Sequence, residues 1–229
     1  MKRLFFSLIL LVVLSFATAA QESYNRADLW EKEIAAFAAA DKKEFPKTGG
    51  VLFVGSSSIR GWKTVQADFA EFQVLNRGFG GSHLEDVNHY FAEIVLPYKP
   101  KLIVLYAGEN DITAGKTIER VVADYKKFVA LVREKLPKSR LIFISLKPSL
   151  ARWEQREKFQ LANNLIKAET EKDKRQRFVD VWQPMLNERA EPKPEIFQGD
   201  KLHLNAEGYK IWRASLTPHI KKGIKGNFR

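Results

Sequence analysis

The chain contains no cysteine, so no disulfide can hold its fold together and no lipid can be attached through a thiol. Without cysteines, and without histidines paired at ligand spacing, the sequence gives no support for a metal site. Hydrophobic residues make up 45% of the 229 positions and include five tryptophans, which is enough apolar material for a well-buried core. The sequence therefore predicts a globular fold stabilised by packing alone, and it implies no cofactor.

Long apolar runs are also missing, except at the N-terminus. There, Lys2 and Arg3 precede an apolar stretch from Leu4 to Phe16, and small residues follow at 17–19. The stretch is shorter than the roughly 20 residues that a membrane-spanning helix needs, and the pattern is typical of a signal peptide over residues 1–19. An uncleaved N-terminal anchor is the alternative. The expected mature protein is a single domain over residues 20–229, with an N-terminal helix and a basic C-terminal tail, exported to the periplasm or secreted.

Acidic residues are fewer than basic ones, 27 against 38, which gives a formal net charge of +11. Such a surface is attracted to polyanions, including the anionic surfaces of a cell envelope. The sequence shows no nucleic-acid-binding module and no basic helix interleaved with stacking aromatics, so we expect no nucleic-acid partner. A surface that merely keeps an exported protein in solution is the simpler interpretation of the charge.

Strand and helix patterns alternate along the rest of the chain. Strands are expected at 51–54, about 72–75, 101–106, 140–145 and 178–181, and helices at 25–43, from Ser82, from Thr117, at 152–172 and after Asn205. A long irregular connection with three prolines covers residues 183–201. This alternation predicts one three-layer α/β/α domain around a parallel sheet of about five strands.

Three of the expected strands end in unusual turns. The first runs into Gly55 and three serines at 56–58, the second into Gly80-Gly81, and the third into Gly108-Glu-Asn-Asp111. In a parallel sheet these carboxyl ends lie at one edge and can share a crevice. A hydroxyl near freed backbone N–H groups and a side-chain amide suits acyl transfer, in which a carbonyl oxygen gains charge. The serines could instead only cap the next helix, because serine is a preferred N-cap residue.

A serine nucleophile needs a base, and the chain has four histidines. His203 follows Asp200 by three residues, a spacing that lets the carboxylate orient the imidazole. The irregular stretch before it could extend about 60 Å, which is enough to carry His203 back to Ser57. His83 is a rival, although we expect it to be exposed in the first turn of a helix that Ser82 and Glu85 cap. His89 and His219 are weaker candidates.

Four sequence blocks in this order resemble the SGNH hydrolases, also called GDSL-like esterases and lipases. The blocks are Phe53-Val-Gly-Ser-Ser-Ser-Ile59, Asn76-Arg-Gly-Phe-Gly-Gly-Ser82, Gly108-Glu-Asn-Asp111 and Asp200-Lys-Leu-His203. The similarity covers about residues 51–212, and the arrangement resembles the branch that contains the platelet-activating-factor acetylhydrolase α subunits. It implies a flavodoxin-like sheet.

The resemblance also assigns roles to individual residues. It makes Ser57 the nucleophile, His203 the base and Asp200 the residue that orients the base. The backbone N–H of Gly81 and the side chain of Asn110 would form the oxyanion hole, together with the N–H of Ser57. One position departs from the family, since Ser56 stands where the Gly-Asp-Ser motif has aspartate.

These observations predict an exported serine esterase that hydrolyses acyl esters through an acyl-enzyme intermediate. Because no long apolar lid segment is present, we expect short-chain or O-acetyl esters, for example on carbohydrates or lysophospholipids. Trp62 and Trp153 could line a pocket for them or belong to the core. The α/β-hydrolase elbow and the dinucleotide fingerprint do not fit, because Ile59 and His83 stand where glycines are required. The alternative function is a non-catalytic envelope protein that binds acidic glycans or lipids.

Overall fold

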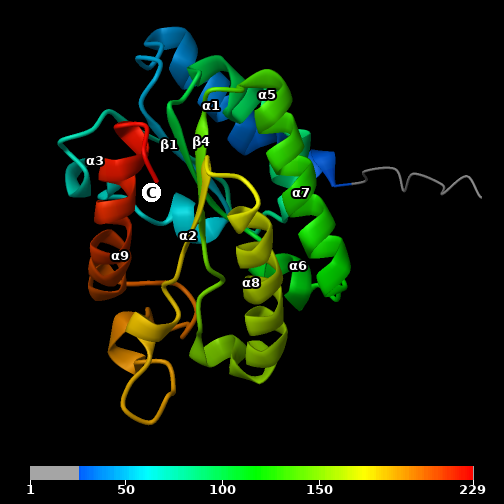
Figure 1. The fold of residues 1–229 in the computed structure, drawn as a ribbon, viewed down its shortest axis with the longest axis vertical. Coiled ribbons are helices and arrows are strands. Elements are labelled where there is room, and N and C mark those ends of the chain that lie inside the picture. Colours follow the sequence, from blue (N-terminus) through cyan, green and yellow to red (C-terminus); the bar gives the residue numbers. More distant parts are fainter. Residues whose placement is uncertain (1–25, 229) are drawn as a thin grey trace, which may run out of the picture.

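The computed structural model describes residues 26–228, so the predicted signal peptide at 1–19 lies outside the described residues. Its centre is a parallel five-stranded sheet in the order β2-β1-β3-β4-β5 (Figure 1). The strands are β1 Val51–Gly55, β2 Val74–Gly78, β3 Leu102–Tyr106, β4 Arg140–Ile144 and β5 Gln176–Val179. This is the flavodoxin-like order, and the predicted α/β/α fold class is confirmed.

Helices cover both faces of the sheet. Figure 1 shows α9 and α3 on one side and α7 and α8 on the other. The α-helices are α1 Glu31–Lys43, α2 Ser57–Arg60, α3 Val65–Asp68, α4 Leu84–His89, α5 Phe91–Ile94, α6 Glu109–Thr113, α7 Ile118–Lys135, α8 Arg156–Glu171 and α9 Ala206–Ile224. Short 3₁₀ helices are η1 Ala27–Leu29, η2 Leu96–Tyr98, η3 Leu150–Gln155, η4 Gln183–Met185 and η5 Pro194–Ile196. Among the described residues, no helix is long and apolar enough to cross a bilayer.

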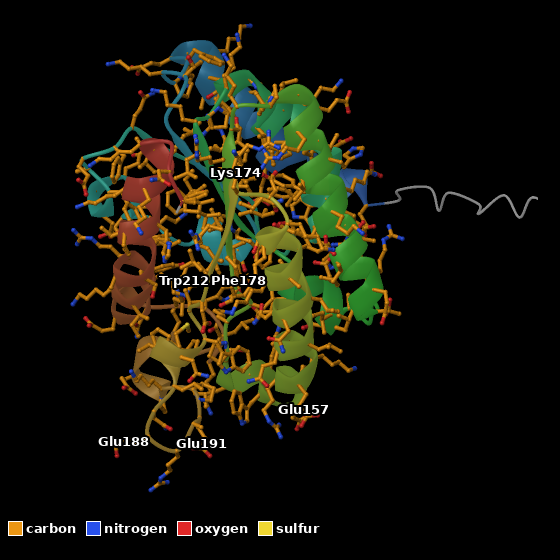
Figure 2. The ribbon with its side chains drawn as sticks, in the orientation of Figure 1. Glu157, Lys174, Phe178, Glu188, Glu191 and Trp212 are labelled. Atoms are coloured by element: carbon orange, nitrogen blue, oxygen red, sulfur yellow. The ribbon has the colours of Figure 1, made fainter. Side chains whose placement is uncertain are left out.

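The central strands β1 and β3 are buried on both faces, which explains their unbroken apolar sequences. In β1, Leu52 and Val54 pack into the core layer beneath α7 and α8, whereas Val51 and Phe53 pack into the layer beneath α9. Figure 2 shows Trp212 of α9 directed inward, and this side chain is fully buried. The two cores fix the sheet between the helical layers.

Some predicted boundaries are wrong in instructive ways. Strand β2 extends to Gly78, so the second block begins inside the sheet and its glycine turn follows the strand end. The helix expected at 25–43 begins only at Glu31, and the preceding 3₁₀ turn η1 contains Leu29, which is 65% exposed. The helix expected from residue 152 begins at Arg156, because Leu150–Gln155 forms the tighter η3 turn.

The connection from Gln183 to Lys201 contains only the 3₁₀ turns η4 and η5 and two isolated bridges, Leu186↔Pro192 and Phe197↔Leu204. Met185 anchors this connection to the core, because the Met185 side chain is fully buried against the indole of Trp212. Figure 2 shows Glu188 and Glu191 at the outer tip of this connection. Its course carries the chain from β5 to the loop that holds His203.

Candidate active site

The end of β1 places a serine at the carboxyl edge of the sheet. Gly55 has a φ of +134°, and a Cβ there would lie 1.9 Å from the carbonyl oxygen of Tyr106 in β3, so only glycine fits. The next N–H, that of Ser56, donates to the same carbonyl oxygen at 2.9 Å. Of the three serines, Ser56 and Ser58 are each only 3% exposed, whereas Ser57 is half-buried. Ser57 is therefore the serine that this turn presents to the site.

His203 and Asp200 meet Ser57 there. The Oγ of Ser57 lies 3.0 Å from Nε2 of His203, and Nδ1 of His203 lies 2.5 Å from Oδ2 of Asp200. An ionised carboxylate can only accept, so Nδ1 carries the proton and Nε2 is free to accept the Ser57 hydroxyl. The three predicted triad residues are thus brought together from two segments 146 positions apart.

Asp200 is held in its ionised form by hydrogen bonds. The pKa of Asp200 is lowered to about 2, chiefly by the hydrogen bond from the His203 side chain and also by the backbone N–H groups of His203 and Leu202. Both N–H groups donate to Oδ1 at 2.9 Å. Lys201 adopts a positive φ of 57° between these residues, which closes the turn. The turn therefore presents a carboxylate to the imidazole over the whole neutral pH range.

The two predicted oxyanion-hole residues follow β2 and β3, the strands on either side of β1. Asn110 belongs to α6, and its Nδ2 donates to the carbonyl oxygen of Ser82 at 3.1 Å. Gly81 follows β2 with a φ of +72°, and a Cβ there would meet nothing within 4 Å. Within residues 26–228, the backbone N–H groups of Ser57 and Gly81 donate to no protein acceptor. These N–H groups and the second hydrogen of the Asn110 amide remain available to an incoming oxygen.

A buried charged cluster, which the sequence analysis missed, lies directly behind Asn110. Glu109 is 3% exposed, accepts hydrogen bonds from Tyr106 Oη at 2.5 Å and Lys147 Nζ at 2.8 Å, and forms an ion pair with Arg152 at 3.1 Å. Burial alone would raise the pKa of Glu109, but the charges of Lys147 and Arg152 outweigh it and lower the pKa. Burial lowers the pKa of Lys147, and Glu109 opposes this shift. The only sequence signal was a lysine three residues after the end of strand β4.

Asp111, in the same block, ties the second and third strand ends together. Its fully buried carboxylate accepts the N–H of Leu84 at 3.1 and 3.2 Å and a bond from Lys116 at 3.1 Å. Burial raises the pKa of Asp111 to about 6, against the opposing effect of Lys116. The carboxylate thus fixes the start of α4 against α6.

The other three histidines lie outside the triad. His83, predicted to be exposed, is instead 5% exposed and is the N-cap of α4, while Asp86 rather than Glu85 accepts the N–H of His83 at 2.7 Å. The helix begins one residue later than expected because Ser82 turns inward, and its hydroxyl donates to Phe79. His89 ends α4, and His219 lies within α9.

The two tryptophans that could have lined a substrate pocket have other roles. Trp62 is fully buried and stacks with Tyr209 at 5.0 Å between centroids, so it belongs to the core. Trp153 stacks on Trp182 at 6.0 Å, and the Arg156 guanidinium lies 5.5 Å from its ring centroid. Neither ring offers an open stacking platform.

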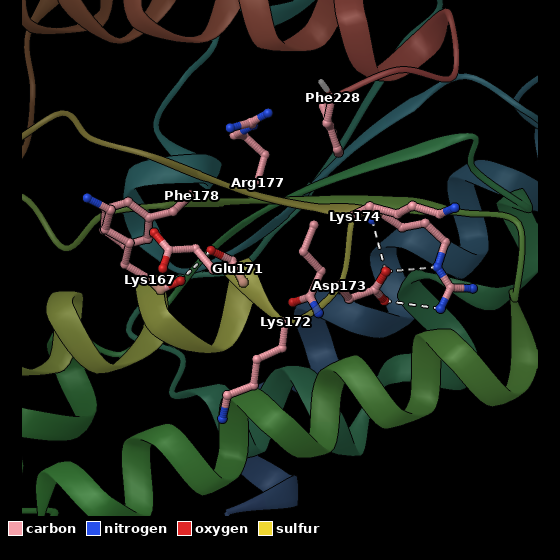
Figure 3. A pocket seen from close by; sticks show the side chains of 11 residues that line it. Lys167, Glu171, Lys172, Asp173, Lys174, Arg177, Phe178 and Phe228 are labelled. Carbon is pink, nitrogen blue, oxygen red and sulfur yellow. Dashed lines mark hydrogen bonds and ion pairs between the residues drawn. The ribbon is translucent and has the colours of Figure 1, made fainter.

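A cavity of about 770 Å³ lies on the outer side of β5, away from the triad (Figure 3). Its lining includes the basic residues Lys167, Lys172, Lys174, Arg175 and Arg177. The carboxylate of Asp173 is engaged by Arg133 at 2.7 Å and by Arg175 at 3.0 Å. The lining contains no histidine, so the cavity has no base of the triad type. Among residues 26–228, no group of three or more histidines and acidic residues is placed to hold a metal ion.

The fold and the site together define a class of protein: a flavodoxin-like α/β/α domain in which a hydroxyl, an imidazole and a carboxylate are hydrogen-bonded in series at the carboxyl edge of the sheet. The profile of the GDSL-like lipase/acylhydrolase family matches residues 49–211. The chain belongs to this family, and it is accordingly a hydrolase of ester bonds.

Comparisons with individual proteins agree with this membership. The chain is 29% identical over 178 residues to the platelet-activating factor acetylhydrolase IB subunit alpha1 of Pongo abelii, covering 74% of each chain. It is similar to the crystal structure of a GDSL-like lipase from Bacteroides thetaiotaomicron, with a TM-score of 0.67 and 26% identity over 86% of this chain and 97% of the other. A carbohydrate esterase of family 3 from Talaromyces cellulolyticus shares the fold at 17% identity, with a TM-score of 0.61 over 76% and 97% of the two chains.

Proposed function

We propose that the protein is an exported serine esterase that cleaves short acyl esters through an acyl-enzyme intermediate. The single observation that carries this proposal is the continuous hydrogen-bonded path from Ser57 Oγ through His203 to Asp200, at 3.0 and 2.5 Å. Separations of this size are those expected of a nucleophile, its base and the group that orients the base.

The reaction follows from the polarity of these groups. As the Ser57 oxygen attacks the ester carbonyl, its proton passes to Nε2 of His203, and the Asp200 carboxylate stabilises the imidazolium that forms. The carbonyl oxygen becomes an oxyanion, which the N–H groups of Ser57 and Gly81 and the Asn110 amide stabilise. His203 then gives its proton to the leaving alcohol. Water repeats the sequence on the acyl-enzyme and releases the acid.

The substrate class we propose is short-chain or O-acetyl esters, carried by carbohydrates or lysophospholipids. Two relatives support it by name, one an acetylhydrolase and the other a carbohydrate esterase. The described connections at the sheet edge include no long apolar lid helix that would shelter an extended acyl chain. Ester hydrolysis over p-nitrophenyl acetate, butyrate, octanoate and palmitate tests the acyl preference, and a maximum at the long chains would contradict it.

Export belongs to the same proposal, and it rests on the signal-peptide pattern at residues 1–19. N-terminal sequencing of the protein purified from a cell fraction should begin near residue 20. An intact Met1 on the protein from a soluble cell extract would contradict export but would leave the proposed catalytic mechanism unaffected.

The catalytic part is tested with the three neighbouring serines. Ser57→Ala should lower p-nitrophenyl acetate hydrolysis by roughly 10³-fold or more, since the nucleophile is lost. Ser56→Ala and Ser58→Ala are the matched controls, because both hydroxyls are buried and neither contacts His203. Equal activity in the wild type and Ser57→Ala would refute the proposed mechanism.

A further inference from the structure

Arg152 in η3 determines which way the Asn110 side chain faces. Both terminal guanidinium nitrogens of Arg152 donate to Oδ1 of Asn110, each at 3.0 Å. A guanidinium has no acceptor, so only the amide oxygen can face it. The amide nitrogen must then face the opposite way, where it donates to Ser82 beside the predicted oxyanion position. A 180° rotation of the amide would present an oxygen to the developing oxyanion and repel it.

The guanidinium is itself held in place from behind. Glu109 binds Arg152 at 3.1 Å and Lys147 at 2.8 Å, and the side chains of Glu109 and Lys147 are 4% and 1% exposed. One carboxylate and two cations leave this buried cluster with one excess positive charge next to Asn110. In a poorly hydrated site, such a charge favours a substrate oxygen that becomes negative.

Arg152 is poorly placed to bind substrate itself. Its side chain is only 16% exposed, and its guanidinium is already engaged by Asn110 and Glu109. The adjacent Ala151 donates its N–H to the carbonyl oxygen of Lys201 at 3.1 Å, in the turn that carries Asp200 and His203. The η3 segment therefore contacts both the oxyanion side and the base side of the site.

We propose that Arg152 is a positioning residue for ester hydrolysis, which locks the Asn110 amide with Nδ2 toward the oxyanion while Glu109 and Lys147 hold the guanidinium. This inference rests on the proposed function, because it assigns Asn110 to the oxyanion hole. The amide orientation matters most when the carbonyl oxygen carries charge, so its loss should affect turnover more than substrate binding.

The first test compares Arg152→Gln with Arg156→Gln. Glutamine at 152 keeps a polar side chain but removes the charge and offers an amide that can face either way. We expect kcat to fall about 10- to 100-fold with KM within about threefold, because one oxyanion donor loses its alignment. Arg156 is the matched control, since it lies four residues along the chain and bonds the Trp153 carbonyl oxygen rather than Asn110. Similar kinetics in the two variants would overturn the proposal.

A double-mutant cycle separates positioning from general structural damage. In an Asn110→Ala background, Arg152→Gln should cause less than about a twofold further loss of kcat, because the group that Arg152 orients is gone. Losses that multiply would overturn the proposal. Arg152→Lys keeps one charge without the paired donors, and we expect it to restore part of kcat. Thermal unfolding of each variant identifies any that fail to fold, and the Lys variant then takes the place of the Gln variant in the cycle.

The experiment also distinguishes this inference from the proposed function. If the wild type hydrolyses esters and Ser57→Ala does not, the proposed function stands and the cycle alone decides the role of Arg152. If the wild type hydrolyses no ester in the chain-length series, the proposed function fails, and the role of Arg152 fails with it.

Discussion

At the scale of single residues, the catalytic geometry depends on local burial. Three adjacent serines are chemically equivalent in the sequence, but the turn after β1 buries Ser56 and Ser58 and leaves Ser57 beside His203. The aspartate of the family motif is replaced by Ser56, whose N–H still bonds β3 and whose backbone caps α2. The contacts that Ser56 makes in this turn are therefore contacts of its backbone.

The carboxylate of Asp200 forms a hydrogen bond with the imidazole of His203, which gives a prediction at this scale. Asp200→Asn should lower kcat by roughly 10²- to 10⁴-fold, because an amide can donate to Nδ1 and so favour the wrong tautomer of His203. Steady-state hydrolysis of p-nitrophenyl acetate measures the effect. Glu207→Gln is the control, since this acid pairs with Lys210 on the surface of α9. A kcat within twofold of the wild type would show that Asp200 does not act on His203.

Sequence reasoning predicted a triad of Ser57, His203 and Asp200 because each stands in a short motif with its own chemical logic, and the structure places His203 within hydrogen-bonding distance of both other residues. It missed Arg152, Lys147 and Glu109 for a physical reason. The contact between Arg152 and Asn110 joins two connections 42 residues apart, and it exists only because β3 and β4 are neighbours in the sheet. Irregular connections have no periodicity, so their side-chain contacts cannot be read before the strand order is known.

At the scale of elements, the start of α9 supports the catalytic loop. Asn205 caps this helix by accepting the N–H groups of Glu207 and Gly208 at 2.9 and 3.2 Å. Its Nδ2 also donates to the carbonyl oxygens of Glu195 and Phe197 at 2.8 and 3.0 Å. The cap therefore joins the long connection to the helix only two residues after His203.

Asn205→Ala should lower the free energy of unfolding by about 1–2 kcal/mol and reduce kcat several-fold, because the cap and the loop geometry are lost together. Thr117→Ala is the control, because it removes the cap of a helix away from the site. The hydroxyl of Thr117 accepts the N–H of Arg120 at 3.2 Å at the start of α7. We expect a comparable loss of stability from Thr117→Ala and an unchanged kcat. Urea unfolding and steady-state kinetics check both, and an unaltered kcat in Asn205→Ala would contradict the link to His203.

The start of α4 predicts a pH dependence of stability. The pKa of His83 is lowered to about 4, first by burial and then by the charges of Lys116 and Arg26. In the unfolded chain the imidazole of His83 takes up a proton near pH 6.5, whereas in the folded protein it stays neutral down to about pH 4. The contribution of His83 to the free energy of unfolding is therefore complete above pH 6.5 and is lost as the pH falls toward 4. The loss amounts to at most about 3 kcal/mol.

Asp111 acts in the opposite direction, because its raised pKa of about 6 makes the folded protein bind a proton more readily than the unfolded chain. As the pH falls through 6, Asp111 therefore adds stability while His83 removes it. Urea unfolding at pH 7.5 and pH 5 measures this effect. As the pH falls from 7.5 to 5, the free energy of unfolding of His83→Gln should decrease less than that of the wild type, or increase. An identical decrease in both proteins would contradict the assignment to His83.

The predicted elements were accurate where a clear pattern met a clear end signal. Thr117 before α7 and the Asn205 cap of α9 gave correct starts within one residue. Errors arose where tertiary contacts decide the boundary. The β2 pairing with β1 extends through Asn76 and Arg77, which are polar and carry no strand signal.

At the scale of the whole molecule, the strand order gathers the site. β1 and β3 are neighbours, β2 lies beside β1, and the connection after β5 returns across the same edge. The alternation of strands and helices was enough to predict this architecture, because parallel sheets place all their carboxyl ends at one edge. The shape of the substrate crevice was beyond the sequence, since it depends on how the η3 segment and the loop before His203 pack.

The net charge of +11 predicts two separate salt dependences. Association with vesicles containing anionic lipid should weaken strongly between 50 and 500 mM NaCl, because ions screen the attraction at about 10 Å or less. Hydrolysis of neutral p-nitrophenyl acetate should change less than about twofold over the same range. Cosedimentation and kinetics measure the two effects. If vesicle association and ester hydrolysis fell in proportion as salt is added, this would contradict the view that hydrolysis of a neutral ester does not depend on the basic surface.

The measurement that tests the central claim most directly is covalent labelling of the serine. A fluorophosphonate should add one phosphonyl group to the protein, and peptide mapping by mass spectrometry should place it on Ser57. His203→Ala should slow the labelling by several orders of magnitude, because the base that activates Ser57 is lost. Labelling at Ser56 or Ser58, or an undiminished rate in His203→Ala, would contradict the assignment of Ser57 and His203 as nucleophile and base.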